Sequence, residues 1–455
     1  MPGLWAPERR ALTVGLVLTV TLMAAEALAV VTIMPQVARD LGGLHLYGWV
    51  FSAFLLSSMI GIVAAGREAD RSGPARPYAV GVVLFGAGLL VAGTAPSMGI
   101  LVVGRTLQGL GAGAVPAVAY VAIGRSFPEL LRARMMAVLS TAWVVPGLVG
   151  PLVSAAVAHV FGWRWVFLGL LPLVAVTGML ALPGLVRLGR PDTPPGDEHR
   201  LVDAVRVTVG TGIVLAGLTT GRLVLAAIAL VVGGAVVVPS LRRLLPAGTL
   251  RARNGLPTTI LSRGLLTFAY FGADAFVTLT VVTVRHHSLG AAGIAVTGST
   301  LAWTAGAWTQ ARLHNTWEGR RLVRTGLVLV LAGVAGMLAV LRPEVPIVIA
   351  YVAWALAGLG MGLAYAPISL MMLRQAPEGR EGWASASLSL SDVLGSALGA
   401  GLGGAAISVA ASRGWPLATG VAVAFAVPAL VAMVALAVSG RLPLRHAARA
   451  VGPSG

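Results

Sequence analysis

Long apolar runs, each about the length of a helix that crosses a lipid bilayer, make up most of this sequence. A membrane-spanning helix needs about 20 mainly apolar residues at a rise of about 1.5 Å per residue. Only 11% of the 455 residues are charged, against roughly 25% in soluble domains, which excludes an ordinary soluble fold. The sequence therefore predicts an all-α integral membrane protein with 14 transmembrane helices, at about 11–34, 47–66, 77–95, 99–124, 134–160, 165–187, 201–219, 222–240, 259–284, 291–311, 323–341, 346–373, 383–410 and 416–439.

The distribution of arginine predicts how the chain is oriented. All 33 basic residues are arginine, and the net charge is +17. They fall mostly in short loops between the apolar runs, which indicates membrane topology and not nucleic-acid binding. With the amino terminus inside, the outer loops hold only Arg39, Arg164, Arg222, Arg285, Arg342 and Arg413. We therefore expect a multi-pass protein of the cell membrane (inner or plasma membrane) with both termini in the cytoplasm.

The chain repeats itself at a spacing of 249 residues. The segment "RSFPE" at 125–129 recurs as "RQAPE" at 374–378, and "GLGAG" at 109–113 recurs as "GLGMG" at 358–362. The repeat predicts two related halves of six helices, with the seventh and eighth runs inserted between them. Parallel repeats of this kind are the layout of a major class of secondary transporters, whose substrate site lies near the midplane between the repeats.

The repeat divides the sequence into three expected parts. Residues 1–190 form an amino-terminal six-helix bundle, and 191–255 hold two linker transmembrane helices and inner loops. Residues 256–455 form a carboxy-terminal six-helix bundle and a cytoplasmic tail.

The loop after the second run, "GREADRSGPARP" at 66–77, carries the most specific motif in the chain. It has the form G-x-x-x-D-R-x-G-x-x-R, and its motif residues are Gly66, Asp70, Arg71, Gly73 and Arg76. In spacing and location it resembles the signature of the major facilitator superfamily. Gly66 is expected to let two helices approach, and Asp70 to cap a helix or pair with an arginine. We expect this loop to govern conformational switching.

Further segments resemble motifs of the same family. "LVVGRTLQGLGAG" at 101–113 is similar to its fourth-helix motif, and "WRWVF" at 163–167 is similar to the start of helix six in drug:proton antiporters. Glu26 stands nine residues before Pro35, a spacing typical of the branch with fourteen helices. "PGLVGPLVSA" resembles the fifth-helix antiporter motif through Pro146, Gly147, Gly150 and Pro151. The resemblance implies the fold of this superfamily and an antiporter that exchanges drugs or other small molecules for protons.

Four ionisable residues inside the apolar runs are the candidate proton-coupling sites: Glu26, Arg105, Asp274 and Asp392. An ionisable side chain near the bilayer centre costs roughly 2.5 to 3.5 kcal/mol on insertion scales, so its presence indicates a function. Static salt bridges between helices are the alternative. Three acids face one base, however, and a poorly solvated acid without a cationic partner can take up a proton near neutral pH. Glu26 is therefore interpreted as a site for a proton, for a cationic substrate, or for both in competition.

The repeat also relates these charges to aromatic residues. A shift of 248 residues places Glu26 on Asp274, and a shift of 249 places Arg105 on Trp354. Aromatic rings can cradle an amphipathic or cationic ligand through cation–π contacts, and packing is the alternative role for each of them. The candidates for lining the substrate cavity are Trp143, Tyr270, Phe271, Phe276, Trp303, Trp354 and Tyr365.

The expected function is secondary active export of a small molecule, and several features of the sequence argue against other classes of protein. No cysteine and no phosphate-binding loop occurs in the sequence, and the adjacent His286 and His287 lack further metal ligands. We therefore expect no enzyme activity, no cofactor and no metal, and the expected partners are protons, the lipid bilayer and a small-molecule substrate. Three alternatives stay open: an exporter or flippase of a lipid or envelope precursor, a proton-coupled uptake transporter, and a transporter-like sensor or scaffold.

Overall fold

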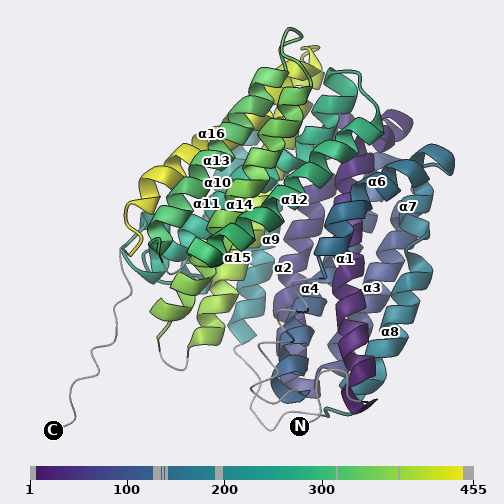
Figure 1. Cartoon of the computed structure of the whole chain (residues 1–455), viewed down its shortest axis with the longest axis vertical. Coiled ribbons are helices and arrows are strands. Elements are labelled where there is room, and N and C mark those ends of the chain that lie inside the picture. Colours follow the sequence, from purple (N-terminus) through teal and green to yellow (C-terminus); the bar gives the residue numbers. More distant parts are fainter. Residues whose placement is uncertain are drawn as a thin grey trace.

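Helices make up every regular element of the computed structural model, which describes residues 7–126, 135, 138, 142–189, 198–313, 316–377 and 380–443 (Figure 1). The predicted all-α membrane fold is confirmed. The α-helices of the described part are α1 (Pro7–Leu41), α2 (Tyr47–Ser72), α3 (Ala75–Gly93), α4 (Met98–Ser126), α6 (Val144–Val160), α7 (Arg164–Leu168), α8 (Leu171–Val186), α9 (Glu198–Thr219), α10 (Leu223–Leu244), α11 (Leu256–Leu279), α12 (Leu289–Leu313), α13 (Gly319–Val340), α14 (Val348–Gln375), α15 (Glu381–Ser412) and α16 (Leu417–Ser439). Short turns are η1 (Leu44–Leu46), η2 (Thr249–Arg251) and the π-helical η3 (Thr280–Val284).

The predicted number of spans is supported approximately. Within the described ranges, 12 helical segments are long and apolar enough to cross a membrane. The two remaining predicted runs correspond to α6, which has 17 residues, and to α12, which has 25. Part of the fifth predicted run, at 134–160, and the linker residues 190–197 lie outside the described residues.

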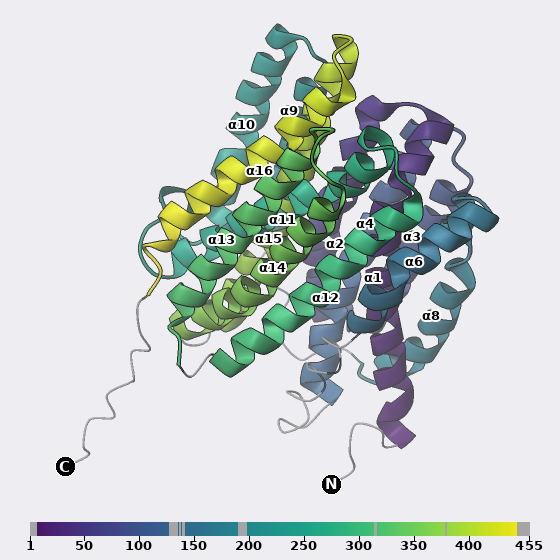
Figure 2. The same ribbon diagram turned by 45° about the horizontal axis from the view of Figure 1, so that its top comes forward.

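The long helices form two bundles and an inserted pair (Figures 1 and 2). The first bundle is α1–α8 and the second is α11–α16. In the first, α2 and α3 pack on α4, and in the second α12 and α13 pack on α14 in the same way. The inserted α9 and α10 pack on each other, and α9 also contacts α2 and α15, where the two bundles meet. This is the predicted arrangement of two pseudo-symmetric six-helix bundles with two inserted helices.

The glycine motifs of the repeat have the same role in both bundles. A Cβ atom on Gly109 would lie 2.1 Å from the backbone oxygen of Phe54, so only glycine lets α4 approach α2 this closely. A Cβ atom on Gly358 would lie 2.1 Å from the backbone oxygen of Ser299, where α14 crosses α12. Residues that the 249-residue shift relates therefore occupy equivalent places in the two bundles.

The two bundles contact each other toward the end of the molecule where α1 finishes and α2 begins, which we call the closed end (top of Figure 1). There Ser52 of α2 donates a hydrogen bond to the backbone oxygen of Ala397 at 2.9 Å. Thr278 of α11 donates to the backbone oxygen of Val31 at 2.6 Å. Helix α6 also packs along α12 (Figure 2). These contacts join the first bundle to the second.

Candidate functional site

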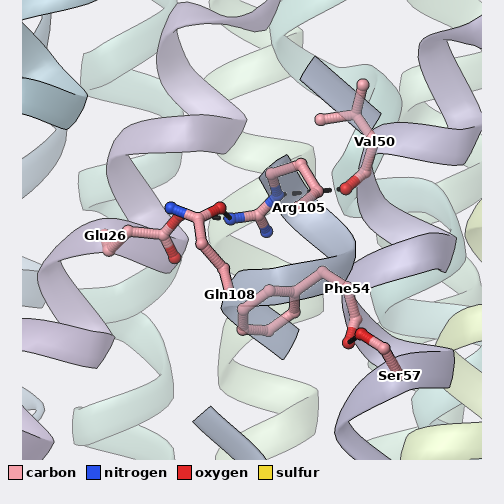
Figure 3. Close-up of polar contacts among 6 residues, drawn as sticks. All are labelled: Glu26, Val50, Phe54, Ser57, Arg105 and Gln108. Atoms are coloured by element: carbon pink, nitrogen blue, oxygen red, sulfur yellow. Dashed lines mark hydrogen bonds and ion pairs between the residues drawn. The ribbon is translucent and has the colours of Figure 1, made fainter. Parts of the chain in front are cut away.

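A buried ion pair joins α1 to α4 in the first bundle (Figure 3). Arg105 Nη1 donates to Glu26 Oε1, and the two side chains are only 3% and 1% exposed. The same guanidinium donates to Gln108 Oε1 at 2.8 Å and, through Nε, to the backbone oxygen of Val50 at 3.1 Å. It also lies 4.2 Å from the ring centre of Phe54. Arg105 therefore balances the charge of Glu26 and connects α4 to both α1 and α2.

The repeat-related acid in the second bundle has a neutral partner. Trp354 Nε1 of α14 donates to Asp274 Oδ1 of α11 at 3.0 Å, and both side chains are buried. The sequence repeat places Glu26 and Arg105 on these same two residues. In each bundle an acid on the first helix thus meets a donor on the fourth helix. Within the described residues, however, the structure shows no salt bridge to Asp274.

The third acid lies near a second buried arginine, which the sequence analysis missed. Arg263 of α11 is 1% exposed, so the expectation of three buried acids against one buried base is wrong. Its guanidinium lies 3.4 Å from the ring centre of Tyr365 and donates to the hydroxyl of Ser369. The hydroxyl of Tyr365 in turn donates to Asp392 Oδ2 at 2.6 Å. Arg263 falls near the start of its predicted run, a position typical of an arginine that reaches the membrane surface.

Five of the seven aromatic candidates form one cluster around Tyr270. Tyr270 stacks on Trp354 with ring centres 5.1 Å apart and meets Phe271 and Trp303 edge-on at 5.1 and 5.5 Å. Tyr365 lies 5.6 Å from Trp303. The rings of Phe271, Trp303 and Tyr365 are only half-buried. Because Trp354 and Tyr365 donate to the two acids of the second bundle, the cluster places aromatic rings beside both carboxyl groups.

The other two aromatic candidates lie elsewhere. Trp143 directly precedes α6 in the first bundle and is 50% exposed, so it does not join the cluster. Phe276 is fully buried, and its ring centre lies 5.8 Å from that of Tyr47 in the first bundle. Phe276 therefore belongs to the contact between the bundles.

The motif of the loop at 66–77, which we call the switch loop, lies where α2 ends and α3 begins. Gly73 follows the last residue of α2 and has φ of 88°, a value that favours glycine. Its N–H donates to the backbone oxygen of Ala69 at 3.0 Å. Among the described residues, a Cβ atom on Gly66 would meet nothing within 4 Å, so the expected close helix approach at Gly66 is not found there.

The charged residues of the same motif are near the surface. Arg76 forms a salt bridge with Glu68 at 3.3 Å across the turn. Asp70 is half-buried, and Arg71 is exposed. These side chains lie where α2 ends and α3 begins, which is a helix length away from the closed end.

The antiporter-like motif lies on α6, which packs against the second bundle. A Cβ atom on Gly147 would lie 2.2 Å from Thr300 Cγ2, so glycine permits the approach of α6 to α12. A Cβ atom on Gly150 would meet no described residue outside its own helix turn within 4 Å. Pro146 lies in the first turn of α6, where proline is tolerated, whereas Pro151 lies inside the helix and removes one backbone hydrogen bond. The motif thus contributes a contact surface between the bundles.

Two pseudo-symmetric helical bundles that carry buried acids at equivalent places define the protein as a polytopic membrane transporter. The family model described as Major Facilitator Superfamily matches residues 15–400. The chain therefore belongs to the major facilitator superfamily and is a transporter, not an enzyme. Within the described residues, no group of three or more His, Asp or Glu side chains is arranged to hold a metal ion.

Curated relatives match either most of the chain or a part of it. A probable multidrug-efflux transporter of Mycobacterium tuberculosis (strain H37Rv) is 28% identical over 443 residues, which cover 91% of this chain and 91% of that protein. The multidrug transporter protein MdtP of Bacillus subtilis (strain 168) is 31% identical over 188 residues, which cover 41% of this chain and 34% of that protein.

Solved structures share the fold at low sequence identity. A bacterial homolog of the human lysosomal transporter Spinster, in an inward-facing and unoccupied conformation, has a TM-score of 0.63 at 15% identity and covers 95% of this chain and 96% of that one. A POT family transporter in complex with a thioalcohol-conjugated peptide has a TM-score of 0.68 at 12% identity, covering 94% and 96%. At these identities the likeness shows the fold alone.

Proposed function

We propose that this protein exports amphipathic or cationic small molecules across the cell membrane in exchange for protons. The observation that carries the proposal is the contrast between the two repeat-related acids. Glu26 is paired with a buried arginine, whereas Asp274 receives a hydrogen bond from a neutral tryptophan. Keeping a buried carboxylate charged without a cationic partner is costly, so such a group tends to bind a proton. Asp274 is therefore the proposed proton carrier, and Glu26 and Arg105 stabilise the first bundle.

The aromatic cluster supports competition between the proton and a cationic substrate. Trp354 and Tyr270 lie beside Asp274, and rings of this kind attract a desolvated cation by about 2 kcal/mol or more. A bound cation favours the charged form of Asp274 and so expels its proton. One proton that enters down a potential of 100 mV supplies about 2.3 kcal/mol, which sustains roughly a 50-fold substrate gradient.

The direction of transport rests on the arginine distribution and on the relatives. With cytoplasmic termini, the closed end faces outside, and the switch loop at 66–77 faces the cytoplasm. A state closed outside can load a substrate from the cytoplasm, as an exporter requires. The names of the relatives from Mycobacterium tuberculosis and Bacillus subtilis, which refer to multidrug efflux and multidrug transport, agree with this direction.

The direct test measures proton release when a ligand binds. Purified full-length protein in weakly buffered detergent solution near pH 7 receives ethidium, an aromatic lipophilic cation. We expect the wild type to release protons, and Asp274→Asn to bind ethidium without releasing them. In membrane vesicles, Asp274→Asn should not accumulate ethidium against a gradient. Asp203→Asn is the matched control, because Asp203 is a buried acid of α9 that pairs with Arg206 and Arg243 outside both bundles.

Other outcomes would replace parts of the proposal. Unchanged proton release from Asp274→Asn would move the proton site to Glu26 or Asp392. Accumulation on the side to which protons move would favour uptake. Transfer of a fluorescent phospholipid between leaflets, without proton release by any cation, would favour a lipid exporter or flippase.

A further inference from the structure

A pocket of about 740 Å³ lies at the closed end, between the two bundles. Residues from α1 and α6 of the first bundle line it on one side. Residues from η3, from the start of α12 and from the loop between them line it on the other side. Its titratable side chains are all basic, and they are Arg39, His159, His286 and His287. Of the described residues that line this pocket, none is acidic.

The charged groups near the pocket do not pair with the four basic side chains that line it. Asp40 follows Arg39 on α1 and is exposed, but it does not line the pocket. Arg285 donates from its guanidinium to three backbone oxygens, one at the last residue of α13 and two in the loop that follows. Arg164, which begins α7, donates to a backbone oxygen at the end of α3 and lies 4.4 Å from the ring centre of Trp163. Arg39 and the three histidines are therefore the basic groups that a ligand in the pocket meets.

Gln36 adds a polar group with unused bonding capacity. Its Nε2 lies 3.4 Å from the backbone oxygen of Ala158. Its Oε1 is buried and has no hydrogen-bond partner among the described residues. In this orientation Gln36 Oε1 is an acceptor that the O–H of a protonated phosphate can satisfy, whereas a half turn of the amide would set this oxygen against the backbone oxygen of Ala158. A buried polar atom that lacks a partner is unfavourable, so a donor group of a ligand would be stabilised here.

Strained backbone holds the histidine pair at the rim. The π-helical turn η3 ends α11, and His286 follows it with φ of 56°, which is uncommon for any residue other than glycine. The N–H of His287 donates to the backbone oxygen of Val281 at 3.0 Å, which fixes the turn. Strain of this kind persists where a particular side-chain placement is needed.

We propose that this pocket binds a small anion of phosphate or carboxylate chemistry, and that the bound anion holds the closed end shut. Arg39 supplies a permanent positive charge, and the imidazoles of the three histidines supply N–H donors. Because Arg39 and His159 belong to the first bundle and His286 and His287 to the second, an anion between them attracts both bundles. Without the anion, no acidic side chain among the described lining residues joins the two sets across the junction.

The site exists only while the bundles are together at this end. Opening the closed end separates the two sets of basic residues, so the anion binds the closed state more tightly and shifts the population toward it. This proposal does not depend on which substrate or coupling ion the transporter moves. The anion can come from dissolved phosphate or from the phosphate of a lipid headgroup, and the two sources share the same chemistry.

The test uses full-length protein in phosphatidylcholine nanodiscs, with inorganic phosphate as the probe. The chain has no cysteine, so Ser52→Cys supplies a single thiol in the contact between the bundles, where Ser52 is buried. We expect phosphate to slow labelling of this thiol and to raise the melting temperature of the protein.

Matched variants then separate the site from general charge effects. We expect Arg39→Gln, and the double change His286→Gln with His287→Gln, to weaken phosphate binding about tenfold or more. Arg342→Gln removes the same charge from an exposed arginine at the same end that does not line the pocket, and it should bind phosphate as the wild type does.

A second arm identifies the source of the anion. Slow labelling in nanodiscs that contain phosphatidylglycerol, with no effect of phosphate in phosphatidylcholine, would assign the site to a lipid headgroup. If neither phosphate nor phosphatidylglycerol slows labelling at pH 6, the proposal is wrong. It is also wrong if Arg342→Gln weakens the effect as much as Arg39→Gln does.

Discussion

The two bundles place an acid and a hydrogen-bond donor at equivalent positions, but only the first bundle gives the donor a charge. In the first bundle, Arg105 binds Glu26 and also reaches the backbone of α2. In the second bundle, Trp354 gives Asp274 one neutral hydrogen bond. The comparison shows how one repeated frame can contain both a permanent ion pair and an acid that is free to exchange a proton.

The energetic cost of removing one partner differs between the ion pair of the first bundle and the neutral hydrogen bond of the second. Removal of one partner from a buried ion pair typically costs about 3–5 kcal/mol, because the other charge is left buried and unpaired. Loss of a neutral donor costs about 1–3 kcal/mol, and protonation of the acid can reduce that cost. The two bundles should therefore respond unequally to equivalent substitutions.

The largest expected effect is that of Arg105→Met. We expect it to lower the free energy of unfolding by about 3–5 kcal/mol, since Glu26 remains buried without its cation. Denaturant unfolding of the purified protein in detergent, followed by tryptophan fluorescence, measures the change. Adding Glu26→Gln to Arg105→Met should recover most of the loss. If Arg105→Met unfolds within about 1 kcal/mol of the wild type, the ion pair is not structural and the comparison fails.

A smaller effect is expected from Arg263→Met, which makes Asp392 resemble Asp274. Asp392 then keeps neutral donors, among them Tyr365. We expect a stability loss of about 1–3 kcal/mol, because the half-buried Asp392 can still reach water. Proton release on ethidium binding should increase, since a second acid now lacks a nearby cation. Arg263→Lys retains the charge and should release protons as the wild type does; equal release from all three proteins would show that Arg263 does not control Asp392.

The smallest effect is expected from Trp354→Phe, which removes the one donor to Asp274 found among the described residues. We expect a loss of about 1–2 kcal/mol at pH 8 and a smaller loss at pH 5, because a hydrogen bond to a charged carboxylate is stronger than one to the protonated acid. Thermal unfolding at the two pH values provides the measurement. Trp303→Phe, in the same aromatic cluster but without a bond to either acid, should show no such pH dependence. A loss for Trp354→Phe that is equal at both pH values would mean that Asp274 keeps one protonation state.

The positions of the helices could be predicted closely because the signal for them is local. A chain in lipid must satisfy its backbone hydrogen bonds within each segment, so an apolar run of sufficient length becomes a helix. The ninth predicted run, 259–284, differs from the observed α11 and η3 by three residues at its start and by none at its end. The repeat similarly predicted that Asp274 would correspond to Glu26 and that Trp354 would correspond to Arg105.

The site was predicted less completely, because its residues depend on which face of a helix they occupy. Tyr270 and Phe276 lie six residues apart on α11, yet one joins the aromatic cluster and the other contacts the first bundle. Gly66 was expected at a close approach, but no described residue outside its own helix turn lies within 4 Å of a Cβ atom built there. Helices that are apolar on all sides carry little pattern to show which face meets a neighbour.

The sequence by itself determined the membrane class, the approximate helix positions, the repeat and the family, because these follow from composition and from patterns along the chain. Only the tertiary structure decided the partners of the buried charges. Nothing in the sequence distinguishes Arg263 from a loop arginine, but the packing of α11 buries it beside Tyr365. The physical reason is that the fate of a charge depends on the groups within a few ångströms of it, and these come from helices about a hundred residues apart in the sequence.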